Sequence, residues 1–176
     1  MKLIQAMKRV KDLTSKAEDL RKKIALNCAD LTIETPTYGD EKQQKAKIEE
    51  WLQAHGDILR EILRLRVAIQ RTNLMTYVTI ELEGKPVTKS IAEWIHRRRD
   101  LAKMSLLAWA SLTDRGLKEH DLQTAKDAKV TEVRIRRYFD PSGRDLKLDL
   151  YRSEPSIIDG ALEVTNAITE LQEAQG

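Results

Sequence analysis

Residues 48–69, IEEWLQAHGDILREILRLRVAI, decide the fold of this chain. Apolar or neutral side chains recur there at alternating steps of three and four, the near-3.5 period of helices wound against partners. This stripe contains Ile48, Trp51, His55, Ile58, Ile62, Leu65 and Ile69. The start of the chain repeats the pattern with Leu3, Met7, Val10, Leu13, Ala17, Leu20, Ile24, Cys28 and Leu31. The spacing predicts two long helices, 2–28 and 40–73, that face each other.

The connection between these helices is short and rich in turn signals. Pro36 disfavours helix at the residue before it, and Gly39 with Asp40 indicates a turn. Asp40 followed three residues later by Gln43 resembles a capping box. A short connection favours an antiparallel hairpin, whose buried residues we expect to include Leu20, Ile24, Trp51, Ile58 and Ile62. Gly56 lies inside the second helix, where glycine lowers helix stability by about 1 kcal/mol relative to alanine. We therefore expect it to be either tolerated or a point of close packing.

In the middle of the chain, apolar and polar residues alternate one by one. Residues 77–82 place Val78, Ile80 and Leu82 on one face, which predicts a strand. A turn at 83–86 follows, and Val87 fits a short return strand. Thr88 is the expected N-cap of a helix over 89–113. The inner face of that helix should include Ile91, Trp94, Ile95, Leu101, Ser105, Ala108, Trp109 and Leu112.

The last third of the chain predicts less regular structure. We expect one helical turn near Leu122, a strand over 130–138 and a turn over 140–143. Helices should follow over 144–152 and, with Ser153 as N-cap and Pro155 in its first turn, over 154–172. The strands 77–82 and 130–138 must pair with each other, with Val87 or with a second subunit, because a lone strand is unstable.

The predicted fold is therefore α+β and mainly α, with a long antiparallel helical hairpin, a small antiparallel β-sheet and further helices. We expect residues 1–75 to form the hairpin and residues 76–176 to form the sheet and helices, packed with the hairpin as one domain. In the sheet, Val78, Ile80, Val133 and Ile135 should point inward, since side chains alternate along a strand.

The composition limits the partners. Of 176 residues, 34% are charged and 5% aromatic, and 31 basic against 28 acidic residues leave a net charge of only +3. That balance gives no general reason to expect nucleic acid or an anionic membrane as partner. The single cysteine cannot form an internal disulfide. No apolar run approaches the roughly 20 residues that span a bilayer, and no signal peptide is evident.

Two basic clusters are the candidate functional residues. Arginines interact well with carboxylates and phosphates, so both clusters are candidate interfaces, although solvated surface explains the same residues. No nucleophile, acid and base occur at catalytic spacing, and the three histidines are scattered, so we expect no enzyme, no cofactor and no metal site. The candidate interface residues are Arg97, Arg98, Arg99, Arg134, Arg136 and Arg137.

Several short motifs resemble one family. The opening Met-Lys-Leu, the pentapeptide Ile69–Asn73, Gly84 and Thr88 are similar in order to the septicolysin-like family of small bacterial proteins, and so are Ile91-Ala92 and Arg98-Arg99-Asp100. The likeness covers mainly residues 1–112, and it departs near Asn166, where the family tends to have Asn-Trp and this chain has Ala167. The resemblance implies a helical hairpin with a small β element. Related chains occur among tailed-phage virion proteins.

We therefore expect a non-enzymatic structural or assembly subunit, with a tailed-phage virion as the favoured setting and a virion or cytoplasmic location. The expected partners are further copies of the chain or other structural proteins. One alternative is a septicolysin-like protein with a membrane or stress role, although mixed charges on the helices disfavour lipid binding. Another is a nucleic-acid-binding accessory protein, which we disfavour because no base-stacking aromatic side chains lie near residues 97–99.

Overall fold

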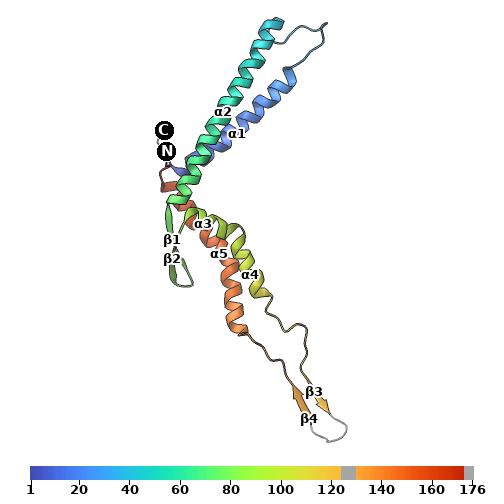
Figure 1. The fold of residues 1–176 in the computed structure, drawn as a ribbon, viewed down its shortest axis with the longest axis vertical. Helices are drawn as coiled ribbons and strands as arrows, with labels where there is room; N and C mark the ends of the chain where they lie inside the picture. The colour runs from blue at the N-terminus through green and yellow to red at the C-terminus, as the bar shows by residue number, and fades with distance from the viewer. Residues whose placement is uncertain (124–129, 173–176) are drawn as a thin grey trace. The chain divides into compact units, whose positions relative to one another are not determined.

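The computed structural model describes residues 1–123 and 130–172. These residues are mainly helical, and α1 (Leu3–Asn27) and α2 (Glu41–Met75) form the predicted hairpin (Figure 1). The chain divides into two compact units. The first contains residues 1–78, 90–92 and 162–176, and the second contains residues 79–89 and 93–161.

The hairpin core follows the predicted 3.5 period with small shifts. Trp51 and Ile62 are buried as expected, whereas Leu20, Ile24 and Ile58 are half-buried. Ala6 takes the place predicted for Met7, whose side chain is 48% exposed. The least exposed residues of α1 and α2 are Leu3, Ala6, Leu13, Ala17, Trp51, Ile62, Leu65, Ala68 and Thr72.

The start of α2 is fixed by the predicted cap. The Gln43 N–H donates to Asp40 Oδ1 over 2.8 Å, and the Asp40 N–H donates to Gln43 Oε1 over 3.1 Å. Two orphan N–H groups are thereby satisfied. The Gln44 side chain donates to the carbonyl of Asn27 over 2.8 Å, which ties the end of α1 to the first turn of α2.

The opposite end of the hairpin holds both ends of the described chain. The Leu3 N–H donates to the Thr169 carbonyl, and the Leu171 N–H donates to the Met1 carbonyl, each over 2.8 Å. The Gln172 N–H donates to the buried hydroxyl of Thr72 over 2.9 Å. Residues distant in sequence are thus joined by backbone hydrogen bonds at this end of the hairpin.

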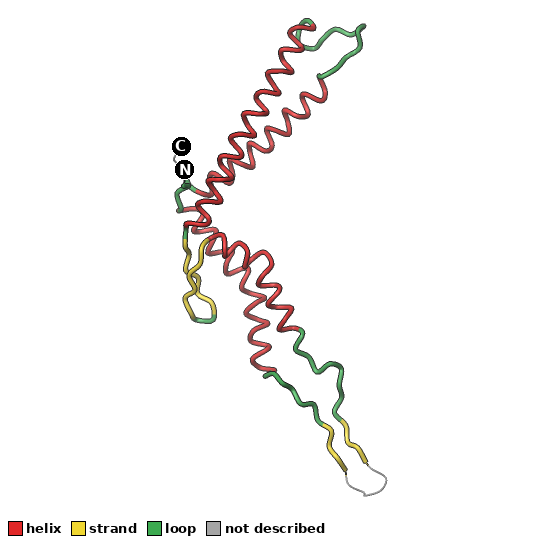
Figure 2. The backbone as a smooth tube through the Cα atoms, in the orientation of Figure 1, coloured by secondary structure: helices red, strands yellow, loops and turns green. Residues whose placement is uncertain are grey.

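The strands form two separate two-stranded sheets (Figure 2). β1 (Tyr77–Leu82) pairs with β2 (Lys85–Ser90), so Val87 belongs to the partner strand, as one of the predicted alternatives had it. Thr88 lies within β2, and its hydroxyl bonds that of Thr79 over 2.7 Å. The prediction that Thr88 caps a helix was therefore wrong. Ile80 is buried while Thr79 and Glu81 are exposed, as the alternation predicted.

The second sheet pairs β3 (His120–Gln123) with β4 (Val130–Val133) in antiparallel register, with His120 opposite Val133. The helical turn predicted near Leu122 was wrong, because this residue belongs to β3. The strand predicted over 130–138 ends at Val133. Val133 and Ile135 are half-buried and their neighbours Arg134 and Arg136 are exposed.

The helix predicted over 89–113 is three consecutive helical segments. They are α3 (Ile91–His96), the π-helix η1 (Arg97–Leu101) and α4 (Ala102–Ala110). A π-turn contains one more residue than an α-turn, so it rotates the helix face that follows. As a result Ala102 is fully buried, and Leu101, which was predicted to face inward, is 43% exposed.

Residues 141–168 form one helix, α5 (Pro141–Ile168), instead of the predicted turn and two helices. The Asp140 carboxylate accepts the N–H groups of Ser142 and Gly143 over 3.2 and 2.7 Å, so the predicted turn is the capped first turn of this helix. The Ser153 hydroxyl donates to the carbonyl of Leu150, so Ser153 does not cap a new helix. Pro155 lies inside α5, where it removes one backbone hydrogen bond.

Candidate functional site

Arg97 forms an ion pair inside the second unit. Its Nε and Nη2 donate to the two carboxylate oxygens of Glu154 over 2.6 and 2.8 Å, and Glu154 is 2% exposed. Arg97 also donates to the Ser105 hydroxyl over 3.1 Å, and its guanidinium lies 5.3 Å from the ring centre of Tyr151. The hydrogen bonds to Glu154 hold the pKa of Arg97 above its ordinary value. Its donors are thus committed to internal partners.

The three neighbouring arginines point in different directions, because consecutive residues of a helix lie on different faces. Arg97 faces Glu154, Arg98 pairs with Asp159 at the surface, and Arg99 is exposed and makes no ion pair with any residue in the described part of the chain. The structure therefore does not gather Arg97, Arg98 and Arg99 on one surface.

Arg134, Arg136 and Arg137 lie beside the end of β4. Arg134 pairs with Asp121 and Glu132 over 3.5 and 3.2 Å. Arg137 forms two hydrogen bonds of 2.6 Å to Asp114, which lower the pKa of Asp114 and raise that of Arg137. Arg136 is exposed and makes no ion pair within the described residues. Arg136 and Arg99 are thus the predicted site residues most available to a partner.

A pocket of about 520 Å³ lies where segment 111–118 faces segment 133–139 in the second unit. Figure 2 shows both segments running as irregular chain next to the β3–β4 sheet. The arginines of the second segment were predicted as candidate interface residues, whereas no residue of the first segment was. The residues that line this pocket include Leu112, Asp114, Arg115, Leu117, Lys118, Ile135, Arg136, Arg137, Tyr138 and Phe139.

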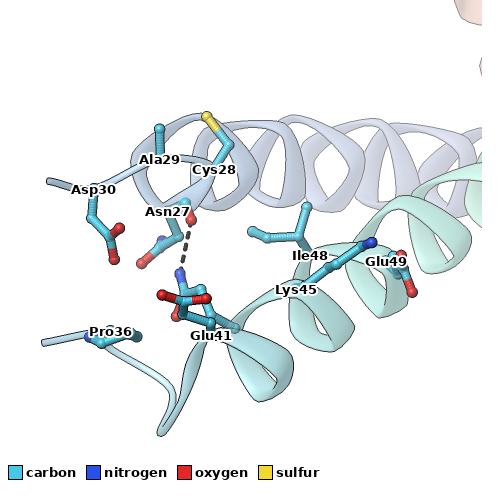
Figure 3. A pocket seen from close by; sticks show the side chains of 10 residues that line it. Asn27, Cys28, Ala29, Asp30, Pro36, Glu41, Lys45, Ile48 and Glu49 are labelled. Atoms are coloured by element: carbon cyan, nitrogen blue, oxygen red, sulfur yellow. Dashed lines mark hydrogen bonds between the residues drawn. The ribbon is translucent and has the colours of Figure 1, made fainter. Parts of the chain in front are cut away.

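A second pocket, of about 360 Å³, lies in the first unit between the end of α1 and the start of α2 (Figure 3). Asp30, Glu41, Lys45 and Glu49 bring mixed charges to it, and Cys28 lies at its edge. The hydrogen bond from Gln44 to Asn27 crosses this region (Figure 3). This hydrogen bond ties the two helices together at the end of the hairpin.

The hairpin also has a second apolar stripe on α2, which the 3.5-residue pattern did not predict. Side chains at these positions project from one side of the helix, because steps of seven and four residues return to the same face. They are separate from the inner stripe that contacts α1. Their exposed fractions are 54% for Leu52, 48% for Leu59, 64% for Leu63, 49% for Val67 and 60% for Leu74.

Two further findings concern the described residues as a group. Within 1–123 and 130–172, no three histidine, cysteine, aspartate or glutamate side chains lie where they could hold a metal ion together. No helix in the same residues has the length and apolar character needed to cross a membrane.

Comparisons with known proteins add one structural likeness. No protein-family model matches this chain, and no curated protein matches it. A crystal structure of a functionally unknown conserved protein from Corynebacterium diphtheriae is similar over 98% of this chain and 99% of that one. The sequence identity is 19% and the TM-score is 0.48.

Proposed function

We propose that this protein is a structural assembly subunit that associates with a second copy of itself through the outer apolar stripe of α2. The observation that carries the proposal is the exposure of five large apolar side chains, from Leu52 to Leu74, along one face. That stripe covers roughly 33 Å of helix at 1.5 Å per residue. Apolar surface of this extent on a helix is a common mark of a protein interface.

Gly56 supports contact with another helix at this stripe. It lies between Leu52 and Leu59 on the same face. A Cβ atom added there would meet only the end of the Arg60 side chain, at 3.9 Å. Packing within the chain therefore gives no reason for a glycine, although glycine destabilises a helix interior by about 1 kcal/mol. Close approach of a second backbone provides that reason.

The charges of α2 favour an antiparallel pairing of two copies. Residues 41–57 have four acids and three lysines, for a net charge of −1, whereas residues 58–75 have four arginines and one glutamate, for a net charge of +3. An antiparallel pair centred on Gly56 places each basic half beside the partner's acidic half. A parallel pair would place +3 beside +3, which is unfavourable.

A twofold axis near Gly56, two residues from Ile58 at the middle of α2, overlaps most of both helices. In this register Leu52 and Leu59 of the two copies meet around the axis, and Leu63 and Val67 lie against the partner's Glu49 and Lys45, whose aliphatic stems cover them. Contact of one helix face with its copy is isologous and closes the assembly at two subunits. A stable contact of this kind should bury at least about 1,000 Å² in total. The arginines of the second unit, including Arg98 and Arg136, are not required for this pairing.

The setting of such an assembly is also a proposal. A tailed-phage particle is the setting that we favour, and its support is the sequence resemblance to the septicolysin-like family and its virion relatives. The absence of an enzymatic role is part of the same proposal, because an assembly subunit needs no catalytic group.

The test compares two substitutions on the same hairpin by sedimentation velocity. Leu63→Glu places a charge in the outer stripe, and Leu26→Glu places the same charge on a leucine that is 81% exposed at the end of α1. We expect a dimer for the wild-type protein and for Leu26→Glu, and a folded monomer for Leu63→Glu. A wild-type protein that stays monomeric at high concentration, or equal behaviour of the two variants, would contradict the proposal.

Gly56→Ala provides a second test, in which two measurements should move in opposite directions. In the monomeric Leu63→Glu background, we expect Gly56→Ala to raise the free energy of unfolding by about 0.5–1 kcal/mol. In the otherwise wild-type protein it should weaken dimerisation at least about tenfold, because the methyl group separates the helices. Stabilisation of both the monomer and the dimer would show that Gly56 does not lie at the crossing point.

A further inference from the structure

The two segments that flank the 520 Å³ pocket are held in place at three points. Arg137 bonds Asp114 twice over 2.6 Å, and the Ile135 N–H donates to Glu119 over 3.2 Å. Arg144 donates to the carbonyl of Leu112 over 3.0 Å. These contacts fix the spacing of two stretches of irregular chain. The pocket between them is therefore a built feature of the second unit.

Three cations at this pocket have no internal counter-charge. Arg115, Lys118 and Arg136 line it, all three are exposed, and none forms an ion pair with a residue that the structure describes. Asp114 pairs with Arg137, Arg134 pairs with Asp121 and Glu132, and the Glu119 carboxylate beside Lys118 accepts the neutral Ile135 N–H. The five basic and four acidic side chains of this region therefore leave a net charge of +1. The pocket thus has an uncompensated positive charge suited to an anion.

The walls of the pocket are apolar and aromatic. Leu117 is 56% exposed, and the Tyr138 ring is 89% exposed although tyrosine is a large, partly apolar side chain. The Arg144 guanidinium lies over the Phe139 ring, 5.6 Å from the ring centre. Tyr138 therefore remains as an open planar surface beside three exposed cations, and aromatic rings next to basic side chains are typical of sites that bind single-stranded nucleic acid.

Arg115 stands in a backbone conformation that suits another residue. It has φ +56° and precedes Gly116 with φ +71°, and the Leu117 N–H donates to the Asp114 carbonyl over 2.9 Å. Two successive positive φ angles closed by this hydrogen bond define a type I′ turn, which favours Asn, Asp or Gly at its first central position. An arginine there costs of order 1 kcal/mol, and strain of this kind is often retained where function requires the side chain.

The turn between β1 and β2 is an internal comparison for Arg115. Glu83 and Gly84 have φ angles of +53° and +69°, so a charged residue occupies the corresponding position there. The Glu83 carboxylate pairs with Lys147 over 2.5 Å, which gives that side chain an internal role. Arg115 has no such role within the described residues, so its side chain is free for an external anion.

We propose that this pocket binds single-stranded nucleic acid, with phosphates at Arg115, Lys118 and Arg136 and a base stacked on Tyr138. This activity is independent of self-association through α2. The aromatic side chain that is missing near residues 97–99 is present at this pocket, at position 138. An acidic peptide would satisfy the three cations, but it would not require the exposed tyrosine ring.

The test is fluorescence anisotropy of a labelled deoxythymidine oligonucleotide of about 12 nucleotides, titrated with the full chain at several salt concentrations. The variants are Arg115→Gly, Arg136→Ala and Tyr138→Ala, and Arg99→Ala is the matched control with an exposed, unpaired arginine outside the pocket. Each removed cation should lower the slope of log affinity against log salt by about 0.7. Tyr138→Ala should weaken binding about tenfold without changing that slope.

Arg115→Gly separates function from folding. Glycine relieves the turn, so we expect a higher melting temperature together with weaker binding, whereas Glu83→Gly should leave binding unchanged. Polyglutamate as competitor tests the other class of partner. The proposal is overturned if the wild-type protein does not bind at low salt, if Arg99→Ala weakens binding as much as Arg136→Ala, or if Tyr138→Ala has no effect while polyglutamate competes equally.

Discussion

The α1–α2 hairpin and the helix run from α3 to α4 solve the same packing problem in different ways. In the hairpin, a period of 3.5 residues keeps one apolar face of each helix against the other, most completely over residues 3–17 of α1 and 51–72 of α2. In the other region, the π-helix η1 shifts the face midway, and a buried ion pair between Arg97 and Glu154 occupies the contact with α5. The first region depends on apolar burial spread over many residues. The second combines buried apolar side chains, including Trp94 and Ile158, with one buried charged pair.

The largest expected effect breaks that charged pair. Glu154→Ala leaves the guanidinium of Arg97 partly buried with no counter-charge, so we expect a loss of about 4 kcal/mol in the free energy of unfolding. Chemical denaturation measures it, and Asp159→Ala, which removes the exposed partner of Arg98, should cost less than about 1 kcal/mol. Similar losses for the two variants would show that burial of Glu154 is not what matters.

A medium effect compares the two faces of α2. Ile62 is 6% exposed against α1, and Ile62→Ala should cost about 3 kcal/mol through lost burial and a cavity. Leu59, three residues earlier, is 48% exposed. In the monomeric Leu63→Glu background Leu59→Ala should therefore change stability by no more than about 0.5 kcal/mol. Equal losses of stability for the two variants in thermal or chemical unfolding would mean that α2 does not bury the face that contains Ile62.

The smallest effect tests the π-helix itself. Deleting Arg99 shortens the π-turn by one residue to an α-turn and leaves the faces before and after it in phase, so we expect a change below about 1 kcal/mol. Deleting the exposed Lys11 from α1 rotates one part of that helix by about 100° against the other, because no π-turn can absorb the loss. Circular dichroism during denaturation should show a much larger loss for the Lys11 deletion.

Much of the fold could be predicted because the hairpin signal is repeated. Each of its turns contributes an apolar residue, so replacing Met7 by Ala6 in the stripe alters the prediction little. The Asp40–Gln43 cap is local and was also predicted correctly. The β1 strand was found because its alternation is evident within six residues.

The failures have physical causes that residue patterns do not display. The π-helix has no sequence marker. The prediction assumed an uninterrupted α-helix over this region and therefore placed Leu101 on the wrong face. Arg97 looked like surface because its partner Glu154 is 57 positions away, and Pro155 made that partner look like the start of a new helix.

The candidate site was predicted in part. Arg136 was named, but Arg115 was not, since only the backbone geometry shows that it occupies a glycine-like position. The outer stripe of α2 could have been predicted, because its apolar residues also recur at helical spacing within the same stretch of sequence as the inner stripe.

The single cysteine offers one labelling site from which the direction of the proposed pairing can be measured. Cys28 is exposed at the end of α1, beside the first turns of α2 (Figure 3), and no other thiol competes with it for a label. In an antiparallel pair centred on Gly56, two spin labels at Cys28 would lie on opposite sides of the twofold axis, roughly 30 Å apart along the helix direction. In a parallel pair they would lie side by side. A paramagnetic distance measurement on unmutated protein therefore reports the direction in which two chains meet.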